Sequence, residues 1–347
     1  MKIAIASVQV PFIKGGAEVH AHNLCKELII RGYEADVVTI PFKWYPASSI
    51  VDGMLAAKLL DLSEVNGNKI DKVIALKFPA YLLEHENKVV WLLHQHRQAY
   101  ELWGTPYGDL ENMEDGIRVR EMIINSDTLA LKGSSKVFAN SKTVAQRLKA
   151  YNNVDSIPLY HPPSNYEKFY CDQFDNYIFY PGRIDEIKRQ HLLIEALSFT
   201  NTPIKILLAG SIENKYEKRI NDLLTQHDLK DRVKFVGFVS EEEKRNLYAN
   251  ALAVYNGPYQ EDYGYVTLEG FFSAKPVLTH SDSGGPLEFV QDEQNGFITE
   301  PSPSAIAKRL DELYNNKNLA REMGKNGRKL MDDLNINWDY VIKRLVE

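Results

Sequence analysis

The segment at residues 258–269 carries two glutamates, Glu261 and Glu269, on either side of a glycine that can begin a helix. We expect residues 264–266 to form the first turn of a helix that runs to about Ala274. The N–H groups and the positive dipole end of such a turn suit an anion such as phosphate. Glu261 precedes the turn and Glu269 lies within the helix, so one can meet a sugar and the other a group on the far side of the phosphate. A nucleotide-sugar site requires this arrangement, and a surface helix with two solvated glutamates is the alternative.

Two cations stand in a segment upstream of this one. Gly182 and Arg183 follow a short apolar run at 177–180, and Lys188 comes five residues after the arginine at the start of an expected helix. Arginine offers a planar fork and lysine a mobile point charge, and both suit phosphate oxygens. The alternative is an exposed pair near a helix end. Together with the segment at 258–269, the two cations favour a diphosphate site.

The first half of the chain offers two further candidates. Gly15 and Gly16 follow the first expected strand and open a helix, at a place where glycine lets a backbone approach a ligand closely. The pair lacks the third glycine of a dinucleotide fingerprint, and no Walker lysine follows it. His94 ends an apolar strand, and ligands of open α/β folds bind beyond the carboxyl ends of strands. The alternative for His94 is a polar strand end that binds nothing.

Metal and serine-nucleophile chemistry lack their usual sequence patterns. The chain contains no Asp-x-Asp, no His-x-x-x-His and no G-x-S-x-G, and Cys25 and Cys171 lie far apart in the sequence. His20 and His22 lie two residues apart on the first helix, so we expect one to be partly buried and the other solvated. We therefore expect no metal and no cofactor.

Length and charge limit the function classes. A chain of 347 residues exceeds what one hydrophobic core usually serves, which predicts two domains. The net charge of −6 arises wholly after Asn165, and a nucleic-acid partner is disfavoured because it would require a basic stripe.

Targeting signals and cysteine use bear on the compartment. Two distant cysteines fit a reduced cytoplasmic compartment. The apolar run at the N-terminus is too short for a signal peptide, and no segment approaches the roughly 20 apolar residues of a membrane helix. We expect a cytoplasmic protein, with peripheral contact at the inner face of the membrane left open.

Short apolar strands and amphipathic helices alternate along the chain, which predicts parallel sheets with crossover helices. In the first half the expected strands are Lys2–Val8, Glu34–Ile40, Asp71–Ala75, Val89–Leu93 and Lys136–Ala139, with helices over Ala17–Arg31 and Lys142–Tyr151. In the second half they are Tyr177–Tyr180, Ile204–Ala209, Val233–Val236, Leu252–Tyr255 and Pro276–Thr279, with helices over Arg189–Leu197, Tyr216–His227, Glu241–Ala249, 264–274, Ser304–Asn315 and Leu319–Leu334.

Domain boundaries follow from the prolines. The segment Pro158–Ser164 holds three prolines, which keep it extended and out of any central strand, so we interpret it as the linker. This gives an N-terminal Rossmann-like domain at 1–163 and a C-terminal one at 164–336. The tail at 337–347 has apolar residues at near-helical spacing, and we expect it to pack back on the first domain.

Several of these motifs, in their order, are similar to those of the retaining glycosyltransferases of family 4, which have the two-domain GT-B fold. The resemblance covers the whole chain and is strongest over 177–300. The matching segments are Phe179–Arg183 with Lys188, Ile206–Gly210, Val233–Ser240, the Glu261 and Glu269 pair, Lys275–Val277, and Gly284-Gly285 with Glu288. In the first half Gly15-Gly16 resembles the glycine loop of the family, and His94 its strand-end histidine.

The resemblance implies roles for these residues. Arg183 and Lys188 would hold the donor diphosphate, Glu269 the ribose and Glu261 the donor sugar. Glu261, His94, Arg183 and Lys188 are the expected catalytic residues. The expected substrate-binding residues are Gly15, Gly16, Gly182, Arg183, Lys188, Gly237, Val239, Glu261, Gly264, Tyr265, Val266 and Glu269.

The expected protein is thus an α/β enzyme with two Rossmann-like, doubly wound domains that face each other across a cleft. It would transfer a hexose from a nucleoside-diphosphate sugar to a hydroxyl of a carbohydrate or lipid-linked acceptor, in envelope polysaccharide or glycolipid biosynthesis. We expect retention of the anomeric configuration and no need for a metal. The alternatives are another GT-B enzyme, such as a sugar-nucleotide epimerase, and a sugar-nucleotide binding protein without catalysis.

Overall fold

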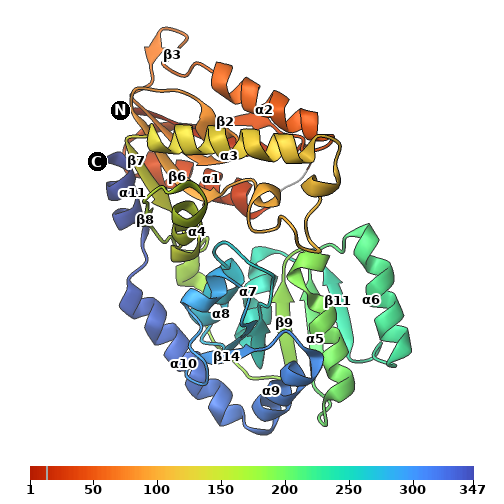
Figure 1. Ribbon diagram of the computed structural model, residues 1–347. Coiled ribbons are helices and arrows are strands. Elements are labelled where there is room, and N and C mark those ends of the chain that lie inside the picture. The colour runs from red at the N-terminus through yellow and green to blue at the C-terminus, as the bar shows by residue number, and fades with distance from the viewer. Residues whose placement is uncertain (13–14) are drawn as a thin grey trace. The chain divides into compact units, whose positions relative to one another are not determined.

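The computed structural model describes residues 1–12 and 15–347 of the chain (Figure 1). These residues form two units, one of Met1–His161 with Asn337–Glu347 and one of Pro162–Ile336. The division lies two residues before the boundary at 163/164 that the prolines suggest. The chain returns to the first unit between Ile336 and Asn337, where the tail was expected to begin.

The N-terminal unit is built on a six-stranded parallel sheet in the order β2-β1-β5-β6-β7-β8. Its strands are β1 (Lys2–Gln9), β2 (Glu34–Pro41), β5 (Lys72–Lys77), β6 (Lys88–His94), β7 (Lys136–Ala139) and β8 (Ile157–Pro158). Its helices are α1 (Gly16–Ile30), α2 (Ala47–Leu59), α3 (Gly116–Lys132), α4 (Lys142–Asn152) and α11 (Trp338–Val346), and a small hairpin joins β3 (Glu64–Val65) to β4 (Asn68–Lys69). Pro158 lies in the edge strand, where a missing N–H is tolerated.

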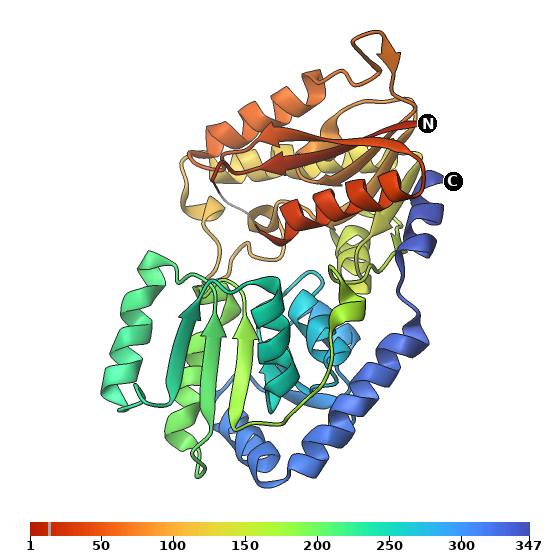
Figure 2. The same cartoon turned by 180° about the vertical axis from the view of Figure 1, so that it is seen from behind.

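Both faces of this sheet are buried, which is why its strands are almost continuously apolar. Alternate residues point to opposite faces. On β1, Ala4 and Ala6 join the core under α2 and α3, whereas Ile3 and Ile5 join the core under α1 and α11. Figure 1 shows α3 in front of the strands, and Figure 2 shows α1 on the opposite face.

The C-terminal helix α11 completes the core of the N-terminal unit. Trp338, Val341, Ile342 and Leu345 are buried on the α1 face of its sheet. The ammonium group of the buried Lys72 donates to the carbonyl of Val346 at 2.6 Å and to that of Leu345 at 3.3 Å. A cation at the end of a helix satisfies carbonyls that have no partner within the helix. The tail is therefore a structural part of this unit.

Two histidines are buried where α1, β6 and α11 meet. The ring of His20 lies 4.2 Å from that of His161 and 4.5 Å from that of Trp91, measured between centroids. Burial lowers the pKa of His20 to about 3. It also lowers the pKa of His161 well below the usual value, and the neighbouring His20 adds to the effect. The expectation of one partly buried and one solvated histidine on α1 was thus right about the exposed His22, while His20 is fully buried.

These pKa values predict that acid destabilises the N-terminal unit. The unfolded chain takes up a proton at each histidine below about pH 6.5, whereas the folded unit does not, so the free energy of unfolding falls as the pH drops through that value. Each histidine contributes about 1.4 kcal/mol per pH unit below about pH 6. All four tryptophans belong to this unit, so tryptophan fluorescence during urea unfolding at pH 7 and pH 5 measures the effect.

The matched variants are His20→Gln and His22→Gln. We expect His20→Gln to lose less stability than the wild type between pH 7 and pH 5, because one of the two protons is no longer taken up. The exposed His22 gives the control. An undiminished pH dependence in His20→Gln would contradict the prediction.

The C-terminal unit has a second six-stranded parallel sheet, in the order β11-β10-β9-β12-β13-β14. Its strands are β9 (Tyr177–Pro181), β10 (Lys205–Ala209), β11 (Val233–Gly237), β12 (Ala253–Tyr255), β13 (Val277–His280) and β14 (Gly296–Thr299). Its helices are α5 (Gln190–Ala196), α6 (Asn214–Gln226), α7 (Glu241–Asn250), α8 (Tyr265–Phe272), α9 (Pro303–Asn315) and α10 (Lys317–Leu334). The prediction of two doubly wound, Rossmann-like domains is confirmed.

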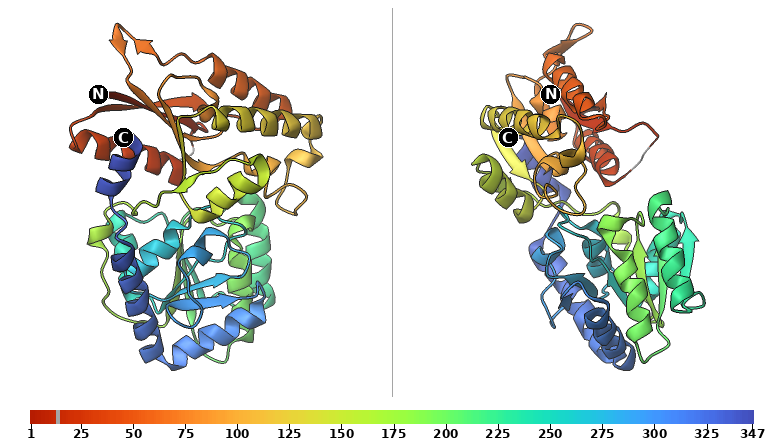
Figure 3. Two further views of the ribbon diagram at one scale, coloured as in Figure 1. Left: turned by 60° about the vertical axis from the view of Figure 1, so that its left-hand side comes forward. Right: turned by 45° about the vertical axis from the view of Figure 1, so that its right-hand side comes forward.

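Helices cover both faces of this sheet as well. The apolar sides of α5, α6 and α9 share one core with alternate residues of β9 and β10. On the other face α8 packs closely, because a Cβ on its Gly270 would lie 3.1 Å from Val277 and 3.3 Å from Val254. The long helix α10, seen in Figure 3, packs against α8 where Gly327 meets the ring of Phe271. Helix α8 is thereby fixed on the sheet.

The sequence did not predict every element. Helices α2 and α3 and strands β3, β4, β8 and β14 were missed, and helix α8 ends at Phe272, two residues earlier than expected. Ala274 has a left-handed backbone with φ of 48°, which a helix cannot continue through.

Candidate active site

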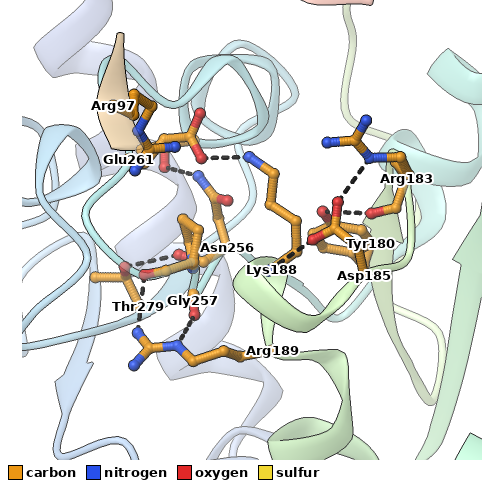
Figure 4. Close-up of polar contacts among 12 residues, drawn as sticks. Arg97, Tyr180, Arg183, Asp185, Lys188, Arg189, Asn256, Gly257, Glu261 and Thr279 are labelled. Atoms are coloured by element: carbon orange, nitrogen blue, oxygen red, sulfur yellow. Dashed lines mark hydrogen bonds and ion pairs between the residues drawn. The ribbon is translucent and has the colours of Figure 1, made fainter. Parts of the chain in front are cut away.

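The sheet of the C-terminal unit reverses its winding between β9 and β12. From β9 the chain proceeds outward to β10 and β11, and from β12 it proceeds the other way to β13 and β14. Ligands of such sheets bind beyond the carboxyl ends of the strands at this switch point. The loops that leave β9 and β12 carry Arg183, Lys188 and Glu261 (Figure 4).

The loop after β9 is organised by Asp185, which the sequence reasoning did not single out. Asp185 caps the short 3-10 helix Glu186–Lys188 by accepting the N–H of Lys188 at 3.0 Å. Its other oxygen accepts from Nε of Arg183 at 2.6 Å. Burial would lower the pKa of Arg183, but the Asp185 carboxylate outweighs it and the pKa is raised. Since 61% of the Arg183 side chain is exposed, its outer N–H groups can meet an anion.

This arrangement predicts that Asp185 tunes the phosphate affinity through Arg183. Asp185→Asn keeps an acceptor for the Lys188 N–H but loses the charge that orients the guanidinium. We expect the KM for the nucleotide sugar that the family resemblance implies to rise about 5- to 10-fold, which corresponds to roughly 1–1.4 kcal/mol for one weakened charged hydrogen bond. Donor kinetics of Asp185→Asn and of Asp222→Asn, an exposed position on α6, provide the comparison. Equal KM values in the two variants would disprove this role of Asp185.

Lys188 and Glu261 form an ion pair across the switch point. Both side chains are largely buried, with 23% and 20% of their surfaces exposed. The loop that carries Glu261 is held by backbone bonds, since the Glu261 N–H donates to Ser283 at 2.8 Å and its carbonyl accepts from Gly285 at 2.8 Å. A Cβ on Gly284 would lie 2.5 Å from that carbonyl oxygen, so a glycine is required there. The structure thus brings together two of the predicted residues that are 73 positions apart.

Helix α8 begins beside this pair. Gly264 is its N-cap, with a left-handed φ of 89° that favours glycine. The first turn at Tyr265 and Val266 presents the N-terminal end of the helix dipole, as predicted, although the helix itself starts one residue later than expected.

Glu269 lies buried inside α8 and is held by groups on α7. It accepts from the Tyr248 hydroxyl at 2.8 Å and pairs with Lys244 at 3.0 Å. Burial would lower the pKa of Lys244, but Glu269 and Glu241 together outweigh it and the pKa is raised. Glu269 is therefore an oriented carboxylate with its charge compensated, and neither partner was predicted from the sequence.

The expected base-binding segment lies at the end of β11. Gly237 ends the strand with a φ of 69°, and its carbonyl accepts from the N–H of Gly210 at 2.8 Å. Val239 is partly exposed. Parallel neighbours in a sheet are about 4.8 Å apart, so the end of β11 lies about 10 Å from that of β9.

The candidates of the N-terminal unit lie at the carboxyl edge of its own sheet. His94 is the last residue of β6, and its Nδ1 lies 2.7 Å from the carbonyl of Gln95. Gly15 donates its N–H to the Glu18 carboxylate at 2.8 Å, and Gly16 begins α1. Lys14, which precedes this glycine pair, lies outside the described residues.

This edge also holds a residue that the sequence reasoning missed. Lys77 ends β5 and is paired in register with His94. Its ammonium lies 3.7 Å from Glu18, and burial lowers the pKa of Lys77. The switch point of this sheet lies between β1 and β5, so Glu18 and Lys77 occupy it.

Within residues 1–12 and 15–347, no three His, Cys, Asp or Glu side chains gather in a way that could hold a metal ion. Of the helices in the described ranges, none combines the length and hydropathy that crossing a bilayer requires.

Comparison with known proteins shows which family the C-terminal unit matches. The model of the family "Glycosyl transferases group 1" matches residues 167–330. The α-1,3/1,6-mannosyltransferase ALG2 of Dictyostelium discoideum is 24% identical over 82% of this chain and 76% of its own length. Among solved structures, sucrose-phosphate synthase of Thermosynechococcus elongatus superposes with a TM-score of 0.76 at 18% identity, over 99% of this chain and 97% of that one.

A second solved structure, HepE of Anabaena in complex with UDP-glucose, gives a TM-score of 0.72 at 16% identity, over 99% of this chain and 98% of its own. These two likenesses show the GT-B fold. Residues 167–330 match the group 1 glycosyltransferases, and the protein is a glycosyltransferase enzyme.

Proposed function

We propose that this glycosyltransferase is a retaining hexosyltransferase that uses a nucleoside-diphosphate sugar. The Lys188–Glu261 pair at the switch point carries the proposal. Beside it lie Arg183 and the N-terminus of α8, so positive charge surrounds the place for a leaving diphosphate. The mannose in the name of ALG2 and the UDP-glucose bound to HepE support a hexose carried by a nucleotide.

We assign each group of residues a part of the donor. Arg183, Lys188 and the backbone of Gly182 and Gly264–Val266 bind the diphosphate, Glu261 the sugar, Glu269 the ribose, and Gly237–Val239 the base. His94 and the Gly15–Gly16 loop serve the transferred sugar and the acceptor from the N-terminal unit.

The reaction follows from these assignments. The bond between the anomeric carbon and the diphosphate oxygen breaks, and the acceptor oxygen bonds to that carbon from the same face. Because the acceptor attacks from the face of the leaving group, retention needs no carboxylate nucleophile, and the acceptor proton passes to the departing diphosphate oxygen. Arg183, Lys188 and the α8 dipole stabilise the charge that develops on the diphosphate, which is the task a divalent metal would otherwise perform.

Retention without a metal can be tested with water as the acceptor. The protein is incubated with UDP-glucose or GDP-mannose in the presence of EDTA, and proton NMR identifies the first-formed anomer of the free sugar. We expect the α anomer, before it equilibrates in solution. An initial β anomer would overturn retention, and activity that disappears with EDTA and returns with magnesium or manganese would overturn metal independence.

The acceptor is proposed from the family resemblance. We propose a carbohydrate or lipid-linked hydroxyl in envelope biosynthesis, used in the cytoplasm at the inner face of the membrane. Both cysteines are free thiols, which fits a reducing compartment. Flotation with vesicles of anionic phospholipid tests membrane contact, and a protein that stays in the lower fraction would contradict it.

A further inference from the structure

Arg189 has an unusual backbone for its residue type. It follows the 3-10 helix that ends in Lys188 and is the N-cap of α5, with a φ of 56°. This left-handed region favours glycine, and a long side chain persists there when its surroundings hold it. Only 4% of the Arg189 side chain is exposed.

The guanidinium of Arg189 connects three loops at the carboxyl edge of the sheet. Its Nε donates to the carbonyl of Gly257 at 2.9 Å, and Nη2 donates to that of Pro258 at 2.8 Å. The same fork holds both oxygens of Asp282, at 2.8 Å from Nη1 and 2.6 Å from Nη2. Figure 4 shows Arg189 reaching Gly257 below the Lys188–Glu261 pair.

The loop that Arg189 holds, at Gly257 and Pro258, is also tightly packed against its neighbours. A Cβ on Gly257 would lie 2.5 Å from the His280 ring and 2.5 Å from the Tyr255 hydroxyl, so the backbone passes through a narrow gap. That hydroxyl also donates to the Arg189 carbonyl at 3.2 Å. The loop then continues to Glu261, whereas Arg189 is directly joined to Lys188.

We propose that Arg189 and Asp282 are positioning residues that set the separation of Lys188 and Glu261, and through it the fit of the donor. The inference rests on the proposed function, since it assumes that these two side chains contact the donor. A planar, bidentate fork fixes direction as well as distance, which a lysine cannot do. The alternative is that Arg189 contributes only to the stability of the C-terminal unit.

Arg232 provides a matched control in the same unit. Its guanidinium donates to the carbonyls of Leu197, Thr202 and Ile204 at 2.9–3.1 Å. It precedes β11, so it lies at the amino edge of the sheet, away from the candidate site. Arg189→Lys and Arg232→Lys each remove an arginine fork that holds carbonyls.

The test compares wild type, Arg189→Lys, Asp282→Asn and Arg232→Lys by calorimetry with UDP and GDP, at a temperature where circular dichroism shows each protein folded. We expect the dissociation constant of whichever diphosphate the wild type binds to rise 10-fold or more in Arg189→Lys and about 5-fold in Asp282→Asn. It should change less than 2-fold in Arg232→Lys, although the melting temperature falls. If Arg189→Lys does not fold, Asp282→Asn decides the result.

Hydrogen exchange gives a readout that needs no ligand. Amides of residues 257–261 should exchange faster in Arg189→Lys than in Arg232→Lys. A wild type that binds neither diphosphate would overturn the proposed function. Wild-type binding with unchanged affinity in the folded Arg189 and Asp282 variants would overturn the positioning role alone.

Discussion

Replacing Lys188 with alanine should weaken nucleoside-diphosphate binding by about 30- to 1000-fold and slow turnover further. Lys188 is largely buried beside Glu261, and losing a charge-assisted contact in such a site costs on the order of 2–4 kcal/mol. The rate should fall more than the affinity, because the charge on the diphosphate grows as the sugar departs. Arg183→Ala should act in the same direction, with a smaller effect on account of its greater exposure.

Calorimetry with the bare diphosphate and initial rates with the sugar nucleotide measure the two effects. Lys308→Ala, at an exposed position on α9, removes a lysine from the same unit and provides the control. Diphosphate affinity equal to wild type in both Arg183→Ala and Lys188→Ala would remove these cations from the site.

Glu261→Gln should separate turnover from diphosphate binding. The proposed contact of Glu261 is with the sugar, so we expect turnover to fall by roughly 100-fold, or about 2.7 kcal/mol. Affinity for the bare diphosphate should be unchanged or higher, because Lys188 loses its protein partner and becomes available to the ligand.

Glu269→Gln should show the opposite pattern. Its carboxylate is held by Tyr248 and Lys244, and its proposed contact is with the ribose, so diphosphate affinity should fall about 10-fold. Glu322→Gln, exposed on α10, serves as the control for both glutamates. Equal losses of affinity in Glu261→Gln and Glu269→Gln would disprove the division of roles.

Secondary structure was predicted best where a local pattern of apolar residues determines it. Strands buried on both faces, such as β5 and β6, appear as unbroken apolar runs, and their ends were predicted within two residues. Helix α2 buries Ala47, Ile50, Met54 and Ala57, a helical spacing that could have been recognised. Strand β14 has four residues and starts with glycine, so its local signal is weak.

The candidate site was predictable in its residue types but not in its contacts. Arg183, Lys188 and Glu261 lie in loops that follow strands and Glu269 lies within a helix, so their positions can be inferred from spacing. Asp185 stands three residues before Lys188, a capping pattern that could have been noticed. The pairs Lys188–Glu261 and Arg189–Asp282 join segments 73 and 93 residues apart, and no local pattern reports such contacts.

A crystal structure of the protein with its preferred nucleoside diphosphate tests the central claim most directly. We predict that the diphosphate lies against Arg183 and Lys188 and the first N–H groups of α8, with the ribose at Glu269. We also predict that Lys188 leaves Glu261 for a phosphate oxygen. A diphosphate bound elsewhere, with the Lys188–Glu261 pair undisturbed, would contradict the account.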